Sequence, residues 1–67
     1  MSYEELTMEV KIKSKRMDAK LEGTVVLEDG TKVRANAKTE IFLIQRMKQI
    51  LAIDYDLTDV KLIIKRI

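Results

Sequence analysis

The N-terminal part of this sequence alternates strictly between apolar and polar side chains. Apolar residues occupy every second position from Leu6 to Ile12, and polar residues occupy the positions between them. A period of two is typical of a strand with one buried face, because successive side chains of a strand point to opposite faces of the sheet. The alternation returns with the opposite parity from Met17 to Leu27. Two strands of one hairpin are therefore predicted.

Positions 13–16 are polar and are predicted to form the turn of this hairpin. Pairing Ile12 with Met17 would place Val10 opposite Ala19. This register keeps all the inward apolar side chains on one face, and a buried face is what specifies register in a sheet.

A helix over residues 2–17 is the competing interpretation of the same segment. Ser2 and Glu5 fit a capping box, in which both side chains bond to the first turn of a helix. The apolar residues of the segment do not form a stripe at helical spacing, so the strand is preferred.

A second turn is predicted around Gly30. A two-residue loop would oppose Leu27 to Lys32 and mix the two faces. A three-residue loop over 28–30 opposes Leu27 to Thr31 and keeps the apolar face intact. This loop is a type I turn followed by a bulge, and it needs Gly30 in the left-handed conformation.

From Thr39 onward the apolar spacing changes to that of a helix. Thr39 is the expected N-cap of a helix over residues 40–53. Its apolar stripe is formed by Leu43, Ile44, Met47, Ile50 and Leu51. Gly23 and Ala35 fall opposite each other in the hairpin, and two small residues there predict a close approach of the helix. Residues 60–67 predict a last strand, whose inward positions are Val60, Leu62 and Ile64.

These elements predict one α+β domain over residues 1–67, in the order β-β-β-α-β. The first three strands form an antiparallel meander. The helix returns the chain after the third strand, so the last strand runs parallel to the third and fits beside the first. We predict a four-stranded sheet in the order 3-2-1-4, a right-handed crossover and the helix packed on one face.

Cysteine and histidine are both absent, which removes several classes of function. The chain can form no disulfide, no thiolate nucleophile and no zinc site of the usual ligands. The two serines have no histidine to activate them, and the two glycines stand apart rather than in a phosphate-binding loop. We expect no enzymatic activity, no cofactor and no small-molecule substrate.

The acidic segment over residues 54–59 is the one pattern that suggests a metal. Asp54 and Asp56 resemble the start of a calcium-binding loop. The sixth and twelfth positions of such a loop need glycine and glutamate, but here they hold Asp59 and Lys65. We expect a solvated turn and no metal site.

The sequence carries no signal for export or for membrane insertion. No apolar run approaches the roughly 20 residues of a transmembrane helix. Residues 1–5 are polar and acidic, unlike a signal peptide. We expect a cytoplasmic protein without a membrane partner.

The outward positions of the predicted strands are strongly basic. They hold nine basic residues, Lys11, Lys13, Arg16, Lys20, Lys32, Arg34, Lys38, Lys61 and Lys65, against four acidic ones, Glu9, Asp18, Glu22 and Glu28. The seven on the first three strands, Lys11 to Lys38, are candidate contacts to nucleic acid. This face lacks aromatic residues, so it suits a duplex backbone better than unpaired bases. The alternative is a solvated face that uses lysine for solubility and edge protection.

Some apolar residues remain after the core is filled. Ile41 and Phe42 lie off the helical stripe, and Ile63 and Ile67 point to the outer face of the last strand. Val26 also points outward. The last strand therefore has apolar residues on both faces. This pattern suggests that the strand is covered on both sides or pairs with another strand at its edge.

We therefore predict a non-catalytic protein-interaction module. Its interface residues are Ile41, Phe42, Ile63 and Ile67, and its partner is a second copy in a homodimer or another protein. The alternative is a small protein that binds double-stranded nucleic acid through the basic sheet face.

Overall fold

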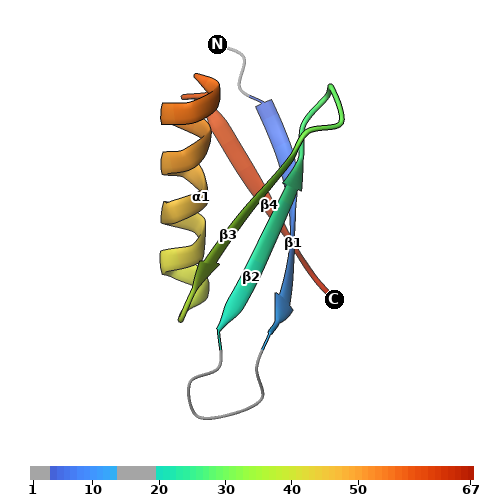
Figure 1. Cartoon of the computed structure of the whole chain (residues 1–67), viewed down its shortest axis with the longest axis vertical. Coiled ribbons are helices and arrows are strands. Elements are labelled where there is room, and N and C mark those ends of the chain that lie inside the picture. Colours follow the sequence, from blue (N-terminus) through green and yellow to red (C-terminus); the bar gives the residue numbers. More distant parts are fainter. Residues whose placement is uncertain (1–3, 14–19) are drawn as a thin grey trace.

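The computed structural model describes residues 4–13 and 20–67. Its elements are, in chain order, β1 (Glu4–Ile12), β2 (Leu21–Val26), β3 (Lys32–Ala37), α1 (Glu40–Tyr55) and β4 (Val60–Arg66). The strands form one sheet in the order β3-β2-β1-β4, with α1 on one side of it (Figure 1). β1 pairs antiparallel with β2 and parallel with β4. The predicted α+β class and strand order are confirmed.

β1 and β2 pair in a register that differs from the predicted one. Ile12 lies opposite Leu21 and Val10 lies opposite Gly23, so the predicted pairing of Ile12 with Met17 is wrong. Positions 17 and 19, the predicted partners, lie outside the described residues. The shift is an even number of residues, so every inward side chain stays inward. The face pattern therefore fits both registers equally well and does not choose between them.

The turn between β2 and β3 has the predicted form. Gly30 has a φ of 91°, and Leu27 N–H donates to the carbonyl of Thr31 at 2.8 Å. The Asp29 carboxylate accepts a hydrogen bond of 2.9 Å from Thr31 N–H, and this bond holds the pKa of Asp29 below its ordinary value. Beyond the turn Val25 lies opposite Val33, as the three-residue loop requires.

α1 begins and ends at defined caps. The Thr39 hydroxyl accepts a hydrogen bond of 3.3 Å from Phe42 N–H, which confirms the predicted N-cap. The helix ends at Tyr55, two residues beyond the predicted end. Asp56 follows with a φ of 56°, and Leu57 N–H donates to the carbonyl of Leu51 at 2.9 Å. This is the bonding of a left-handed C-cap, which most often uses glycine.

The core lies between α1 and the inner face of the sheet. Its buried residues are Leu6, Met8, Val10, Val25, Val33, Ala35, Leu43, Met47 and Leu51. α1 packs mainly against β3 and β2. A helix is about 10 Å wide and strands are about 4.8 Å apart, so one helix covers about two strands. The inward side chains of β4 are accordingly only half-buried.

Candidate interaction surfaces

The acidic segment over residues 54–59 lies at the C-terminal end of α1 and in the connection to β4. Among residues 4–13 and 20–67, no group of three His, Cys, Asp or Glu side chains is arranged to hold a metal ion. Asp56 caps α1, and Asp54 and Asp59 are exposed.

For its part, α1 falls short of the length and hydropathy needed to cross a bilayer.

The outer face of the sheet, turned away from α1, carries the predicted nucleic-acid contacts. Polar positions of each strand point to this face because side chains alternate. Six of the seven predicted contacts are described, and all six are exposed: Lys11, Lys13, Lys20, Lys32, Arg34 and Lys38. Arg16, the seventh, lies outside the described residues. The structure therefore places the described candidates on or beside one face.

Glutamates interrupt the basic residues of the outer face. Glu9 lies between Thr24 of β2 and Lys65 of β4. Glu5 lies opposite Lys61, so the pairing of β1 with β4 adds Glu5 to the acidic residues predicted for this face. A polyanion on the outer face would meet both signs of charge.

Glu22 neutralises part of the same face. Its carboxylate forms an ion pair of 3.2 Å with the Nζ of Lys13 and lies opposite Lys11 in the sheet. The hydrogen bond from Lys13, together with the charges of Lys11 and Arg34, holds the pKa of Glu22 below its ordinary value. Glu22 is therefore ionised at neutral pH and weakens the attraction for phosphate.

The four predicted interface residues are all exposed but lie in two places. Ile41 and Phe42 are in the first turn of α1, and Phe42 lines a hollow together with residues of β3. Ile63 lies on β4, at the opposite edge of the sheet, and Ile67 directly follows this strand. Ile53, at 80% exposure, is a further candidate. Its position off the apolar stripe of the predicted helix was the signal for it in the sequence.

The free edge of β4, called here the β4 edge, presents backbone groups as well as apolar side chains. Glu4 N–H donates to the carbonyl of Asp59, and Ile67 N–H donates to the carbonyl of Val10. Backbone groups alternate sides along a strand, so the N–H and C=O groups of the even-numbered residues of β4 point away from β1. Within the described part of the chain, no strand pairs with this edge.

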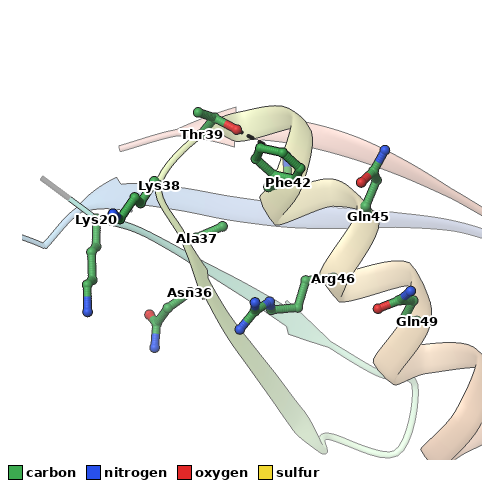
Figure 2. Close-up of a pocket in the computed structure, with 9 residues that line it drawn as sticks. All are labelled: Lys20, Asn36, Ala37, Lys38, Thr39, Phe42, Gln45, Arg46 and Gln49. Atoms are coloured by element: carbon green, nitrogen blue, oxygen red, sulfur yellow. Dashed lines mark hydrogen bonds between the residues drawn. The ribbon is translucent and has the colours of Figure 1, made fainter. Parts of the chain in front are cut away.

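A hollow of about 770 Å³, called here the basic hollow, lies beside β3 and the N-terminal half of α1 (Figure 2). Its described lining residues are Lys20, Asn36, Ala37, Lys38, Thr39, Phe42, Gln45, Arg46 and Gln49. Three of them are basic and none is acidic. Figure 2 shows the Arg46 side chain extending from α1 toward β3, where Asn36 lies.

The cations of the basic hollow are not neutralised by the described residues. The ion pairs of this part of the chain join Lys13 to Glu22 and Arg66 to Glu40, and neither pair lies in the hollow. Lys20 and Lys38 are predicted contacts, whereas Arg46 comes from the helix and was not among them. The sequence gives no sign that Arg46 lies near Lys20 and Lys38, because only the fold brings the three residues to one surface.

No protein-family model matches the sequence, and neither a curated protein nor a solved structure shows a significant match to it. Function is therefore inferred from the surfaces themselves. The exposed apolar residues indicate an interaction surface.

Proposed function

We propose that this domain is a non-catalytic protein-interaction module that forms a homodimer through the β4 edge. The observation that carries the proposal is an edge strand with free backbone groups and two exposed isoleucines, Ile63 and Ile67. Such an edge is a template for pairing with another chain. Two-fold pairing of the same edge on two copies is self-complementary and closes after two copies.

The small core gives a second reason for a partner. One core in a chain of this size rarely supplies more than about 3–5 kcal/mol of stability. The inward side chains of β4 are only half-buried, because α1 packs over the other half of the sheet. Pairing at the β4 edge would bury further apolar surface, at about 25 cal/mol for each Å² removed from water.

Charge complementarity favours one register for the dimer. Centring the two-fold axis on Leu62 places Asp59 of each copy opposite Lys65 of the other. Centring it on Ile63 instead places Lys61 opposite Lys65 twice, and like charges directly opposite are destabilising. An axis at Ile64 creates no pair of opposite charges. We therefore propose antiparallel pairing centred on Leu62.

Light scattering over a concentration series tests the dimer. We expect a dimer for the wild type and at least about tenfold weaker association for Ile63→Lys combined with Ile67→Lys, because lost apolar burial and new lysines at the edge both oppose pairing. Val26→Lys is the matched control, since Val26 is exposed on the outer face of β2, away from the edge.

Two outcomes contradict the proposal. A wild type that stays monomeric at high micromolar concentration removes the homodimer. A double variant that associates as strongly as the wild type and the Val26→Lys control removes the β4 edge as the interface.

Binding of duplex nucleic acid to the outer face is the weaker candidate. Glu5, Glu9 and Glu22 lie among its cations, and Lys13 is already paired with Glu22. A row of phosphates binds best where cations are not neutralised. In the basic hollow, no carboxylate lies among the described residues that line it beside Lys20, Lys38 and Arg46.

A further inference from the structure

We infer that the basic hollow binds a short segment of single-stranded nucleic acid. This inference is independent of the homodimer. The hollow lies beside β3, whereas the β4 edge is on the other side of the sheet, so the dimer leaves it open. Charge, an exposed aromatic ring and side-chain amides of the hollow support this inference.

Charge supplies the attraction for the phosphates. Lys20 and Lys38 come from the strand ends, and Arg46 comes from α1. The described lining contains no carboxylate to compete for them. Arginine and lysine that neutralise phosphates release counterions, and this release makes backbone binding favourable at low salt.

Phe42 supplies a flat apolar surface in the same hollow. Its side chain is 62% exposed although it is large and aromatic. The N–H of Phe42 donates to the Thr39 hydroxyl, so the first turn of α1 holds the residue in place (Figure 2). Aromatic rings beside a basic surface are where proteins stack unpaired bases. The outer face of the sheet lacks such a ring, and the hollow provides one.

Polar side chains surround the ring without adding charge. Asn36 lies on β3, and Gln45 and Gln49 lie on successive turns of α1. Each amide has both a donor and an acceptor, so it can bond to the edge of a base that is not paired.

The combination favours a single strand over the other polyanions. A duplex keeps its bases stacked inside and offers no free base face to Phe42. An acidic peptide would satisfy Lys20, Lys38 and Arg46 but would leave the ring without a stacking partner. Only an unpaired nucleotide chain uses the cations, the ring and the amides together.

Fluorescence anisotropy with labelled oligo(dT) and oligo(rU) of about ten nucleotides tests the inference in about 50 mM salt, where phosphate contacts are strong. We expect at least one of the two strands to bind, and more tightly than a duplex of equal length. Three phosphate contacts predict a slope of about −2 for log K against log salt concentration, at ~0.7 for each contact with a single strand. Arg46→Gln removes one phosphate contact, so it should make that slope less steep by about 0.7.

Substitution of Phe42 tests the stacking. Phe42→Ala should weaken binding by about tenfold, within the range seen when a base-stacking aromatic is removed. Phe42→Trp should keep the affinity. Because the sequence has no other tryptophan, quenching of its fluorescence would report the stacked base directly.

Matched controls come from the same helix. Lys48→Gln removes an exposed cation that does not line the hollow, and Ile53→Ala truncates an exposed apolar residue that does not line it either. Both should bind like the wild type.

Any of four results would overturn the inference. These are no binding of either strand at low salt, equal or tighter binding of the duplex, equally tight binding of a poly-glutamate peptide, or the same loss in the control variants as in Arg46→Gln and Phe42→Ala.

Discussion

Two residues of the described chain hold their backbone in the left-handed region, and only one of them is glycine. Gly30 has a φ of 91° in the β2–β3 turn, and Asp56 has a φ of 56° at the end of α1. The first could be predicted, because the apolar face requires a three-residue loop there. The second could not, because aspartate adopts this conformation far less often than glycine and gives no sequence signal for it.

Replacement of Gly30 by valine should destabilise the domain by about 1–2 kcal/mol. An added Cβ would meet no atom within 4 Å, so the whole effect comes from the backbone conformation rather than from a clash. A β-branched residue is poorly tolerated at positive φ. Urea unfolding of the two proteins measures the difference.

Gly30→Asn is the control for this experiment, since asparagine adopts the left-handed region more readily than other residues. It should lose clearly less stability than Gly30→Val. Equal losses in the two variants would show that φ is not the cause.

At the scale of elements, the packing of α1 on the sheet depends on the absence of a side chain at Gly23. A Cβ built there would lie 2.8 Å from the Sδ of Met8 and 3.2 Å from the Cδ2 of Leu43. Both neighbours are fully buried in the core, so moving either one disturbs the side chains packed around it. The small residue predicted to allow a close approach of the helix is therefore confirmed.

Gly23→Ala should cost about 1–3 kcal/mol of stability, because an added methyl group overpacks this part of the core. The clash with Met8 implies coupling between the two positions. In a Met8→Ala background the same substitution should cost at least about 1 kcal/mol less, as measured in a double-mutant cycle of urea unfolding. Strictly additive effects would mean that Met8 is not the residue that resists the methyl group.

The elements were easier to predict than their register. Alternation of apolar residues located β1 to β3, and the change to helical spacing located α1, because both patterns reflect a single buried face. The β1–β2 register was wrong because slips by two or four residues leave Met8 and Val10 on the same face. In the observed register Gly23 lies close to both Met8 and Leu43, and contacts between such distant parts of the chain leave no trace in the alternation.

The same limit applies to the candidate site. The outward lysines could be predicted from strand parity alone. The basic hollow could not, since Lys20 precedes β2, Lys38 follows β3 and Arg46 is in α1, and the three share a surface only once α1 is placed beside β3.

At the scale of the whole molecule, the proposed dimer predicts which positions meet at the two-fold axis. Leu62→Cys should form a disulfide between copies efficiently under mild oxidation, because the axis places residue 62 opposite itself. The strand is antiparallel to its partner, so Cα atoms of opposite residues lie about 4.5–5.5 Å apart, within the reach of a disulfide.

Ile63→Cys and Ile64→Cys are the matched controls. They should cross-link more slowly than Leu62→Cys on non-reducing gels. Fastest cross-linking at either control position would leave the β4 edge as the interface but move its axis. The absence of cross-linking in all three variants, with a dimer still seen by light scattering, would place the interface elsewhere.

The pairing of β1 with β4 also affects how the domain reaches its native state. Glu4 lies opposite Val60 in this pairing, so the central strand β1 gains its second neighbour only from the C-terminal part of the chain. Closing so long a loop carries a larger entropy loss than closing either hairpin, and non-local pairings slow folding. We therefore expect docking of β4 to be a late step of folding. A chain in which β4 is not docked would expose β1 as an edge, and unpaired strand edges favour aggregation.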